Sequence, residues 1–142
     1  MKNNFRFFCI VTLLISSVFL NGCKKDAVAD PADQFVGNYS YIITVTGDLS
    51  GTDSGDLTVT KGASNKLIMK QSGGTNTYYT VNGNSIEEDS GQTVDLPIQN
   101  GGTAAFSENS TGTLSANTLT INGTWSKTGY NIQSFKVIAL KK

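Results

Sequence analysis

The side chains that most enzymes use for nucleophilic or metal chemistry are nearly absent from this chain. It contains no His, its only Arg is Arg6, and its only Cys residues are Cys9 and Cys23. Ser-His-Asp and Cys-His arrangements both require a His as the base, so neither is possible here. Zinc and other transition-metal sites lose their usual His and Cys ligands for the same reason. We therefore expect no metal and no cofactor.

Carboxylates are the remaining groups with catalytic potential, and two Asp-Ser-Gly triplets occur, at 53–55 and 89–91. Aspartic proteases use a pair of such triplets, because two carboxylates that share one proton act as base and acid. A catalytic triplet follows apolar strand residues, whereas Gly51-Thr52 and Glu87-Glu88 precede these two. Asp, Ser and Gly are also common in turns. We therefore expect turns here, no catalytic residue and no enzymatic activity.

Two further groups of acids have both a functional and a plain interpretation. Asp48, Asp53 and Asp56 lie close in sequence and could offer oxygen ligands to calcium, but they match no EF-hand spacing. A solvated hairpin loop explains them equally well. The run 87–89 is expected to be a solvated strand edge, because the sequence identifies no second acid for a glycosidase pair. An enzyme that uses only carboxylates, Lys or Tyr is a third alternative for the function.

The distribution of basic residues argues against a nucleic-acid partner. The formal net charge is zero, and Lys2 and Arg6 precede position 24, which leaves nine lysines, no Arg and all eleven acids in the rest of the chain. Recognition of phosphates and guanines depends on clusters of Lys and Arg. We expect no nucleic acid among the partners.

The elements that would position a site begin only after a distinctive N-terminal segment. Lys2 and Arg6 flank the apolar run 7–20, which is short for a membrane span. A basic start, an apolar run and a following small residue are typical of a secretory signal peptide. A buried core helix is the alternative, but it does not explain the terminal position or the basic flank.

The end of this segment, Leu20-Asn21-Gly22-Cys23, resembles a bacterial lipobox. The resemblance implies cleavage after Gly22 and acylation of Cys23, by fatty acids such as palmitate, with the membrane as partner through this lipid. Two or more acyl chains attach a protein stably. A soluble secreted protein with one free thiol is the alternative. Residues 24–34 are polar and predict a flexible tether. The predicted organisation is a lipoprotein signal peptide at 1–22, lipidated Cys and tether at 23–34, and one folded domain at 35–142.

Beyond the tether, apolar and polar residues alternate with the period of two that strands require. Asn82-Gly83 between two such runs is a strong hairpin signal, and no segment shows a helical repeat. The fold class is therefore all-β, an antiparallel meander of about eight to ten strands closed as a barrel, because closure removes free sheet edges. A two-sheet β-sandwich is the alternative. The runs are at 35–45, 57–59, 67–69, 79–81, 94–98, 104–106, 114–125 and 135–139.

Two segments carry a family resemblance. Gly37-Asn38-Tyr39 resembles the Gly-x-Trp opening of lipocalins, with Tyr in place of Trp. The segment 112–121, together with 135–140, is similar to the last hairpins of lipocalin-like and calycin-like domains on Bacteroidota lipoproteins. The resemblance implies a barrel that encloses a small apolar ligand, on a protein anchored in the cell envelope at the outer membrane. It leaves the periplasmic or surface-facing side open.

Aromatic residues on the strands are the candidate ligand contacts. A structural role in the core is the alternative, because aromatics are common in strands. The leading hypothesis is a non-enzymatic, lipid-anchored envelope barrel that binds a small apolar or amphipathic ligand. The second is a surface module that binds a glycan or a protein partner, including a protease that it inhibits. Aromatics around an internal void would favour the first hypothesis. The candidates are Tyr39, Tyr41, Tyr79, Trp125 and Phe135.

Overall fold

The computed structural model describes residues 29–98 and 101–142. The predicted signal peptide, Cys23 and the first part of the predicted tether lie outside the described residues. Among the helices of the described part, none has the length and apolar character to cross a bilayer. The described elements are the 3-10 helix η2 (Pro31–Phe35) and the strands β1 (Gly37–Thr46), β2 (Gly51–Lys61), β3 (Lys66–Gln71), β4 (Asn76–Asn82), β5 (Ser85–Glu88), β6 (Thr93–Pro97), β7 (Thr103–Ser115), β8 (Thr118–Ser126) and β9 (Gln133–Lys141).

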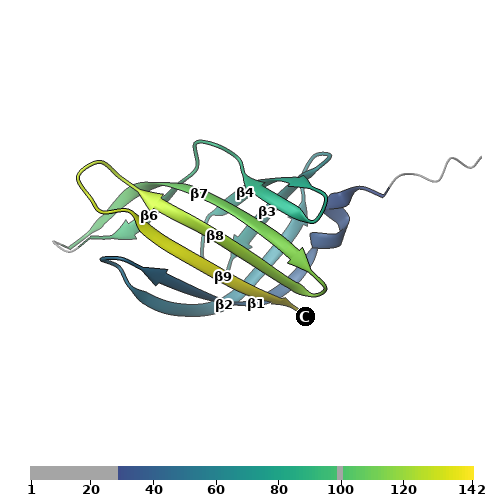
Figure 1. Ribbon diagram of the computed structural model, residues 1–142, viewed down its shortest axis with the longest axis horizontal. Coiled ribbons are helices and arrows are strands. Elements are labelled where there is room, and N and C mark those ends of the chain that lie inside the picture. Colours follow the sequence, from purple (N-terminus) through teal and green to yellow (C-terminus); the bar gives the residue numbers. More distant parts are fainter. Residues whose placement is uncertain (1–28, 99–100) are drawn as a thin grey trace, which may run out of the picture.

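The strands form one closed antiparallel sheet (Figure 1). Neighbours in sequence pair with each other, with the exception of β5 and β6, and β1 also pairs with β9. Closure comes from β7, which pairs with β5 through Ser85↔Thr113 and with β6 through Thr93↔Ser107. Because β5 and β6 follow one another along the same side of β7, they fill one position of an eight-strand barrel. The predicted all-β meander and barrel are confirmed.

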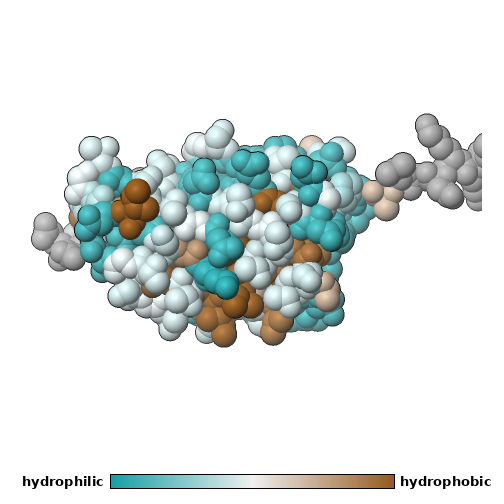
Figure 2. Space-filling model, viewed as in Figure 1, coloured by the Kyte–Doolittle hydropathy of each residue, from teal (hydrophilic) through white to brown (hydrophobic). Residues whose placement is uncertain are grey.

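The period of two in the sequence separates the inside of the barrel from its outside. On β1, Tyr39 and Tyr41 are buried whereas Ser40 is exposed. On β9, Phe135 and Val137 are buried and alternate with exposed residues in the same way. The inward residues form a single hydrophobic core, while the face of the barrel in Figure 2 is largely polar with scattered apolar patches. Alternating burial of this kind is what a strand with one face toward a core requires.

The short helix η2 closes one end of the barrel. Asp30 caps it, since its carboxylate accepts a hydrogen bond from the Ala32 N–H at 2.9 Å. Ala32 and Phe35 are fully buried, and the Tyr39 hydroxyl donates to the Phe35 carbonyl oxygen at 2.7 Å. The sequence assigned residues up to Gln34 to a flexible tether and began the folded domain at residue 35. That boundary is too late, because burial of Ala32 and Phe35 joins η2 to the barrel.

The hairpin predicted at Asn82-Gly83 is present between β4 and β5. Asn82 pairs with Ser85, so the two turn residues are Gly83 and Asn84. Gly83 has φ +60°, and Asn84 does not share the positive φ. A positive φ at the first turn residue alone is the pattern of a type II′ hairpin, in which Gly is favoured at that position.

Candidate functional site

The end of the barrel opposite η2 contains a cavity of about 530 Å³. Along β1, the lining begins at Tyr41 and continues through Ile43 to Val45, near the end of the strand. Apolar residues from β2, β3, β8 and β9 complete much of the wall. A volume of this size lies within the range of small-molecule sites, which are mostly apolar and hold a few polar groups.

Four of the five aromatic candidates line this cavity: Tyr41, Tyr79, Trp125 and Phe135. The rings of Trp125 and Phe135 stack, with centroids 4.5 Å apart and an interplanar angle of 26°. Tyr39 is not part of the lining, because it lies nearer η2 and bonds to its backbone. The structure therefore brings four candidates to one cavity, while their contact with a ligand stays a prediction.

The wall is lowest where β3 turns into β4. The pairing of β2 with β3 begins only at Leu57↔Gln71, next to a bond from the Ser72 N–H to the Asp56 carbonyl, so residues 51–55 of β2 pair with β1 alone. Gly74, Thr75 and Asn76 of the following turn and strand line the cavity.

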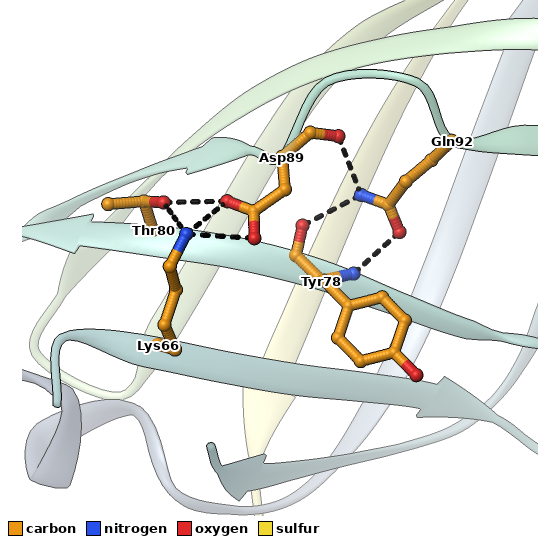
Figure 3. A network of polar contacts seen from close by, with 5 residues as sticks. All are labelled: Lys66, Tyr78, Thr80, Asp89 and Gln92. Carbon is orange, nitrogen blue, oxygen red and sulfur yellow. Dashed lines mark hydrogen bonds and ion pairs between the residues drawn. The ribbon is translucent and has the colours of Figure 1, made fainter. Parts of the chain in front are cut away.

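A second gap in the wall, between β4 and β6, is closed by a side chain. The pairing of β5 with β4 ends at Tyr79↔Glu88, and β6 pairs with β7. Gln92 fills the position opposite Tyr78, as Figure 3 shows. Its Oε1 accepts from the Tyr78 N–H at 2.7 Å, and its Nε2 donates to the Tyr78 carbonyl at 2.8 Å and to the Asp89 carbonyl at 3.1 Å. The Asp89 N–H also donates to the Tyr78 carbonyl at 2.9 Å, so the Gln92 amide supplies the acceptor for the Tyr78 N–H that a neighbouring strand would otherwise provide.

Asp89, the first residue of the second Asp-Ser-Gly triplet, anchors the same connection on the outer face (Figure 3). Lys66 Nζ donates to its two carboxylate oxygens at 2.8 and 2.9 Å, and the Thr80 hydroxyl donates at 2.6 Å. The Lys66 ammonium and the Thr80 hydroxyl hold the pKa of Asp89 below its usual value. Asp53 of the first triplet lines the cavity instead. The two carboxylates therefore lie on opposite sides of the barrel wall.

Glu88 lies inside the barrel, so the predicted solvated edge is wrong for this residue. On β5, Ile86 and Glu88 are buried while Glu87 faces outward. The hydroxyl of Ser110 donates to Glu88 Oε2 at 2.7 Å and shares a hydrogen bond of 2.9 Å with the Tyr79 hydroxyl. Burial raises the pKa of the Glu88 carboxyl, although the bonds from Ser110 oppose this effect.

Glu108 is a second inward acid, and it reaches the cavity itself. It lies opposite Trp125 in the pairing of β7 with β8, and both side chains line the cavity. Burial and the nearby Glu88 charge raise the pKa of Glu108 to about 7, while the Trp125 indole N–H nearby lowers it. In the described part of the chain, Trp125 Nε1 and Glu88 Oε1 are buried and have no hydrogen-bond partner. An acid, an indole N–H and a carboxylate oxygen thus adjoin one end of an apolar cavity.

No protein-family model, curated protein or solved structure matches this chain. The lipocalin-like resemblance is supported only at the level of the fold, because a closed antiparallel barrel of eight strand positions is compatible with it.

The sequence analysis did not select Glu108, although one signal was present. Glu108 is two residues after Phe106 and six residues before Leu114, so all three side chains point to the same face of the strand. Phe106 and Leu114 are both buried. The polar run 107–113 between them hid this alternation, because Ser, Asn and Thr at its other positions resemble a surface strand. Counting in steps of two from the apolar residue Phe106 would have placed Glu108 on the inner face of the strand.

The acids considered for calcium are dispersed. Asp48 accepts a hydrogen bond from the Asn131 side chain at 2.9 Å, and Asp56 forms an ion pair with Lys142 at 2.6 Å. Asp53 lines the cavity. Within the described ranges, no three acidic side chains gather as a metal ion would need.

Proposed function

We propose that this protein binds a small apolar or amphipathic ligand in the open end of its barrel and does not transform it. The observation that carries the proposal is a cavity of about 530 Å³ in a barrel whose other end is plugged by η2. Aromatic side chains supply large apolar contact area at little cost in conformational freedom. Four of the candidate aromatics lie on the cavity wall.

The direction of the aromatics favours this function over a surface interaction module. Tyr41, Tyr79 and Trp125 point into the barrel. Among the described residues, the exposed aromatics are Tyr78 on β4 and Tyr130 in the β8–β9 connection. A module that binds glycans or proteins through aromatics would be expected to display them together on the outside.

The proposal includes an anchor in the bacterial envelope, at the outer membrane. It rests on the lipobox-like sequence before Cys23, which lies outside the described residues. The intact mass of the protein purified from bacterial membranes tests this part separately. We expect the native protein to carry the added mass of a diacylglycerol and an acyl chain. The Cys23→Ser variant should lack both additions. A native protein with an unmodified Cys23 would contradict the anchor and leave the proposal of ligand binding unaffected.

A titration of the full-length protein with 1-decanol, followed by calorimetry and by the fluorescence of Trp125, tests ligand binding. Trp125 is the only Trp in the chain and lies on the cavity wall. Saturable binding is expected, and Ile43→Phe, which fills part of the cavity, should weaken it about tenfold. Ile42→Phe is the matched control because Ile42 faces outward and is 59% exposed. Absence of saturable binding, or equal affinity in both variants, would overturn the proposal.

One observation also favours the carboxylate enzyme that the sequence left as a third alternative. Glu88 is close enough to Glu108 for its charge to raise the pKa of Glu108 inside the barrel. However, Glu88 is occupied by Ser110 and only Glu108 lines the cavity. Hydrolysis of nitrophenyl glycosides that is lost in Glu108→Gln would support an enzyme. Binding without turnover is the outcome that we expect.

A further inference from the structure

The charged groups on the cavity wall are all acidic. Asp53 and Glu108 line it, and no Lys belongs to the described lining. Two lysines at the other end are engaged there: Lys61 pairs with Asp30 and Asp33, and Lys141 donates to the Gln34 carbonyl of η2. The chain contains no His that could supply a positive charge instead. The described cavity wall therefore carries acidic side chains and no basic one.

Two buried polar atoms beside Glu108 also lack a partner. Trp125 is 8% exposed and Glu88 is 9% exposed, and Trp125 Nε1 and Glu88 Oε1 make no hydrogen bond with any described residue. A buried polar atom without a partner destabilises the folded protein, because it has lost its hydrogen bonds to water. Glu88 Oε1 is an acceptor, so a ligand that brings a hydrogen-bond donor to this polar end would satisfy it, whereas the Trp125 N–H lies beside the Glu108 carboxylate.

We propose that the ligand carries a protonated amine at one end, that the Glu108 carboxylate binds this ammonium group, and that the apolar part of the ligand lies against Trp125 and Phe135. The inference deepens the proposed function and depends on it, since it assigns a chemical class to the ligand of the same cavity.

Charge and hydrogen bonding both favour a cation over other head groups. An ammonium ion would neutralise the acids of the cavity, whereas the carboxylate of a fatty acid would add a further negative charge near Glu88 and Glu108. The indole N–H of Trp125 can donate to one oxygen of the charged Glu108 carboxylate, and the other oxygen can accept a hydrogen bond from the ammonium group. The faces of Trp125 and Tyr79 also attract cations. A neutral alcohol would gain none of the charge-dependent contributions.

A series of octyl compounds with one tail and different heads tests the proposal on the full-length protein. Octylamine, 1-octanol and octanoate are titrated at pH 8 by calorimetry, with Trp125 fluorescence as a second signal. We expect octylamine to bind at least about tenfold more tightly than 1-octanol, with octanoate the weakest. No saturable binding of any compound would remove the proposed function itself. Equal binding of all three would leave that function and overturn the ammonium site.

Two substitutions locate the preference. Glu108→Gln keeps the shape of the side chain and should reduce octylamine to the affinity of 1-octanol. Glu87→Gln is the matched control, because it removes the same charge from the outer face of β5. Asp53→Asn examines the other acid of the lining. A preference that survives in Glu108→Gln, or that only Asp53→Asn removes, would overturn the assignment to Glu108.

The pH dependence of octylamine binding is a further test, because it would not change if Glu108 had only a structural role. Lowering the pH from 8 to 5 protonates Glu108, so octylamine affinity should fall while 1-octanol affinity stays constant. The other titratable groups that face Glu108 or share its cavity are Glu88 on β5, Tyr79 on β4, Tyr41 on β1 and Asp53 on β2. All of them remain in Glu108→Gln. Persistence of the pH dependence in this variant would therefore assign it to another group and contradict the proposal.

Discussion

Gln92 and Tyr78 are joined by two hydrogen bonds of opposite direction, at 2.7 and 2.8 Å, which close the barrel where two strands do not pair. The Tyr78 N–H donates to the Gln92 side chain, and the same side chain donates to the Tyr78 carbonyl. Tyr78 and Gln92 also border the cavity. One side-chain amide therefore both seals the wall and forms part of the lining of the candidate site.

Replacement of Gln92 by Ala should remove both hydrogen bonds and open the barrel wall between β4 and β6. Each net hydrogen bond contributes about 1 kcal/mol, and the free energy of unfolding should fall by about 1–2 kcal/mol because the site is partly exposed. Exchange of the Tyr78 amide hydrogen should become faster, since its acceptor is lost. Urea unfolding and hydrogen exchange measure the two effects. Gln92→Glu keeps an acceptor for the Tyr78 N–H, so this amide should exchange more slowly in Gln92→Glu than in Gln92→Ala. Equal exchange rates in the unmodified protein and in both variants would contradict the role of Gln92 as acceptor.

The stability of the protein should fall as the pH rises from about 4.5 to about 7. The folded state holds the Glu108 proton to a pKa of about 7, above the usual value of 4.5, so it binds more protons than the unfolded state in this window. Stabilisation is complete below the window and is lost above it, with a total of about 2–3 kcal/mol. Urea unfolding at several pH values measures the slope.

Glu108→Gln should remove most of this slope and raise stability at pH 8. Glu88, whose pKa is also raised by burial, contributes in the same direction and should leave a residual slope. Asp89 acts in the opposite sense, because its pKa is lower in the folded protein than in the unfolded chain. Its contribution to stability is therefore complete above the usual pKa of Asp and is lost as the pH falls below that value. An unchanged slope in Glu108→Gln would show that another group titrates in this window.

Ala116 occupies the left-handed region with φ +51°, in the turn between β7 and β8. This conformation costs an L-residue about 1–2 kcal/mol, whereas Gly adopts it freely but loses more entropy on folding. We expect Ala116→Gly to stabilise the protein by up to about 1 kcal/mol in urea unfolding. Asn117→Gly is the control, because Asn117 has no positive φ and should gain nothing. Equal effects at both positions would refute the explanation by strain.

Gly123 leaves the room that the stacked aromatic pair requires. It lies opposite Ser110 on β7 and Phe135 on β9, and a Cβ there would overlap with both side chains. Gly123→Ala should destabilise the protein by about 1–3 kcal/mol in urea unfolding. It should also change Trp125 fluorescence, because Phe135 must move. Gly51→Ala, where a Cβ meets no atom within 4 Å, should stay within about 0.5 kcal/mol of the unmodified protein.

The alternation of residue types predicted the apolar parts of the strands and which of their side chains face inward, although it missed the inward acids Glu88 and Glu108. Tyr41 and Val137 are separated by most of the chain, yet each could be assigned to the interior from its immediate neighbours. This succeeds because side chains on a strand alternate between two faces, so local sequence carries the information. The absence of His likewise excluded whole classes of chemistry without any structure.

The closure of the barrel and the polar end of its cavity were decided by the tertiary structure. Glu88 and Glu108 come together only because β7 pairs with β5, and Phe35 is buried only because η2 covers one end of the closed barrel. Such neighbours depend on long-range register, and their altered pKa values depend on burial that no single segment provides. The sequence alone determined which faces of the strands are inside, whereas the enclosed site required the sheet to close.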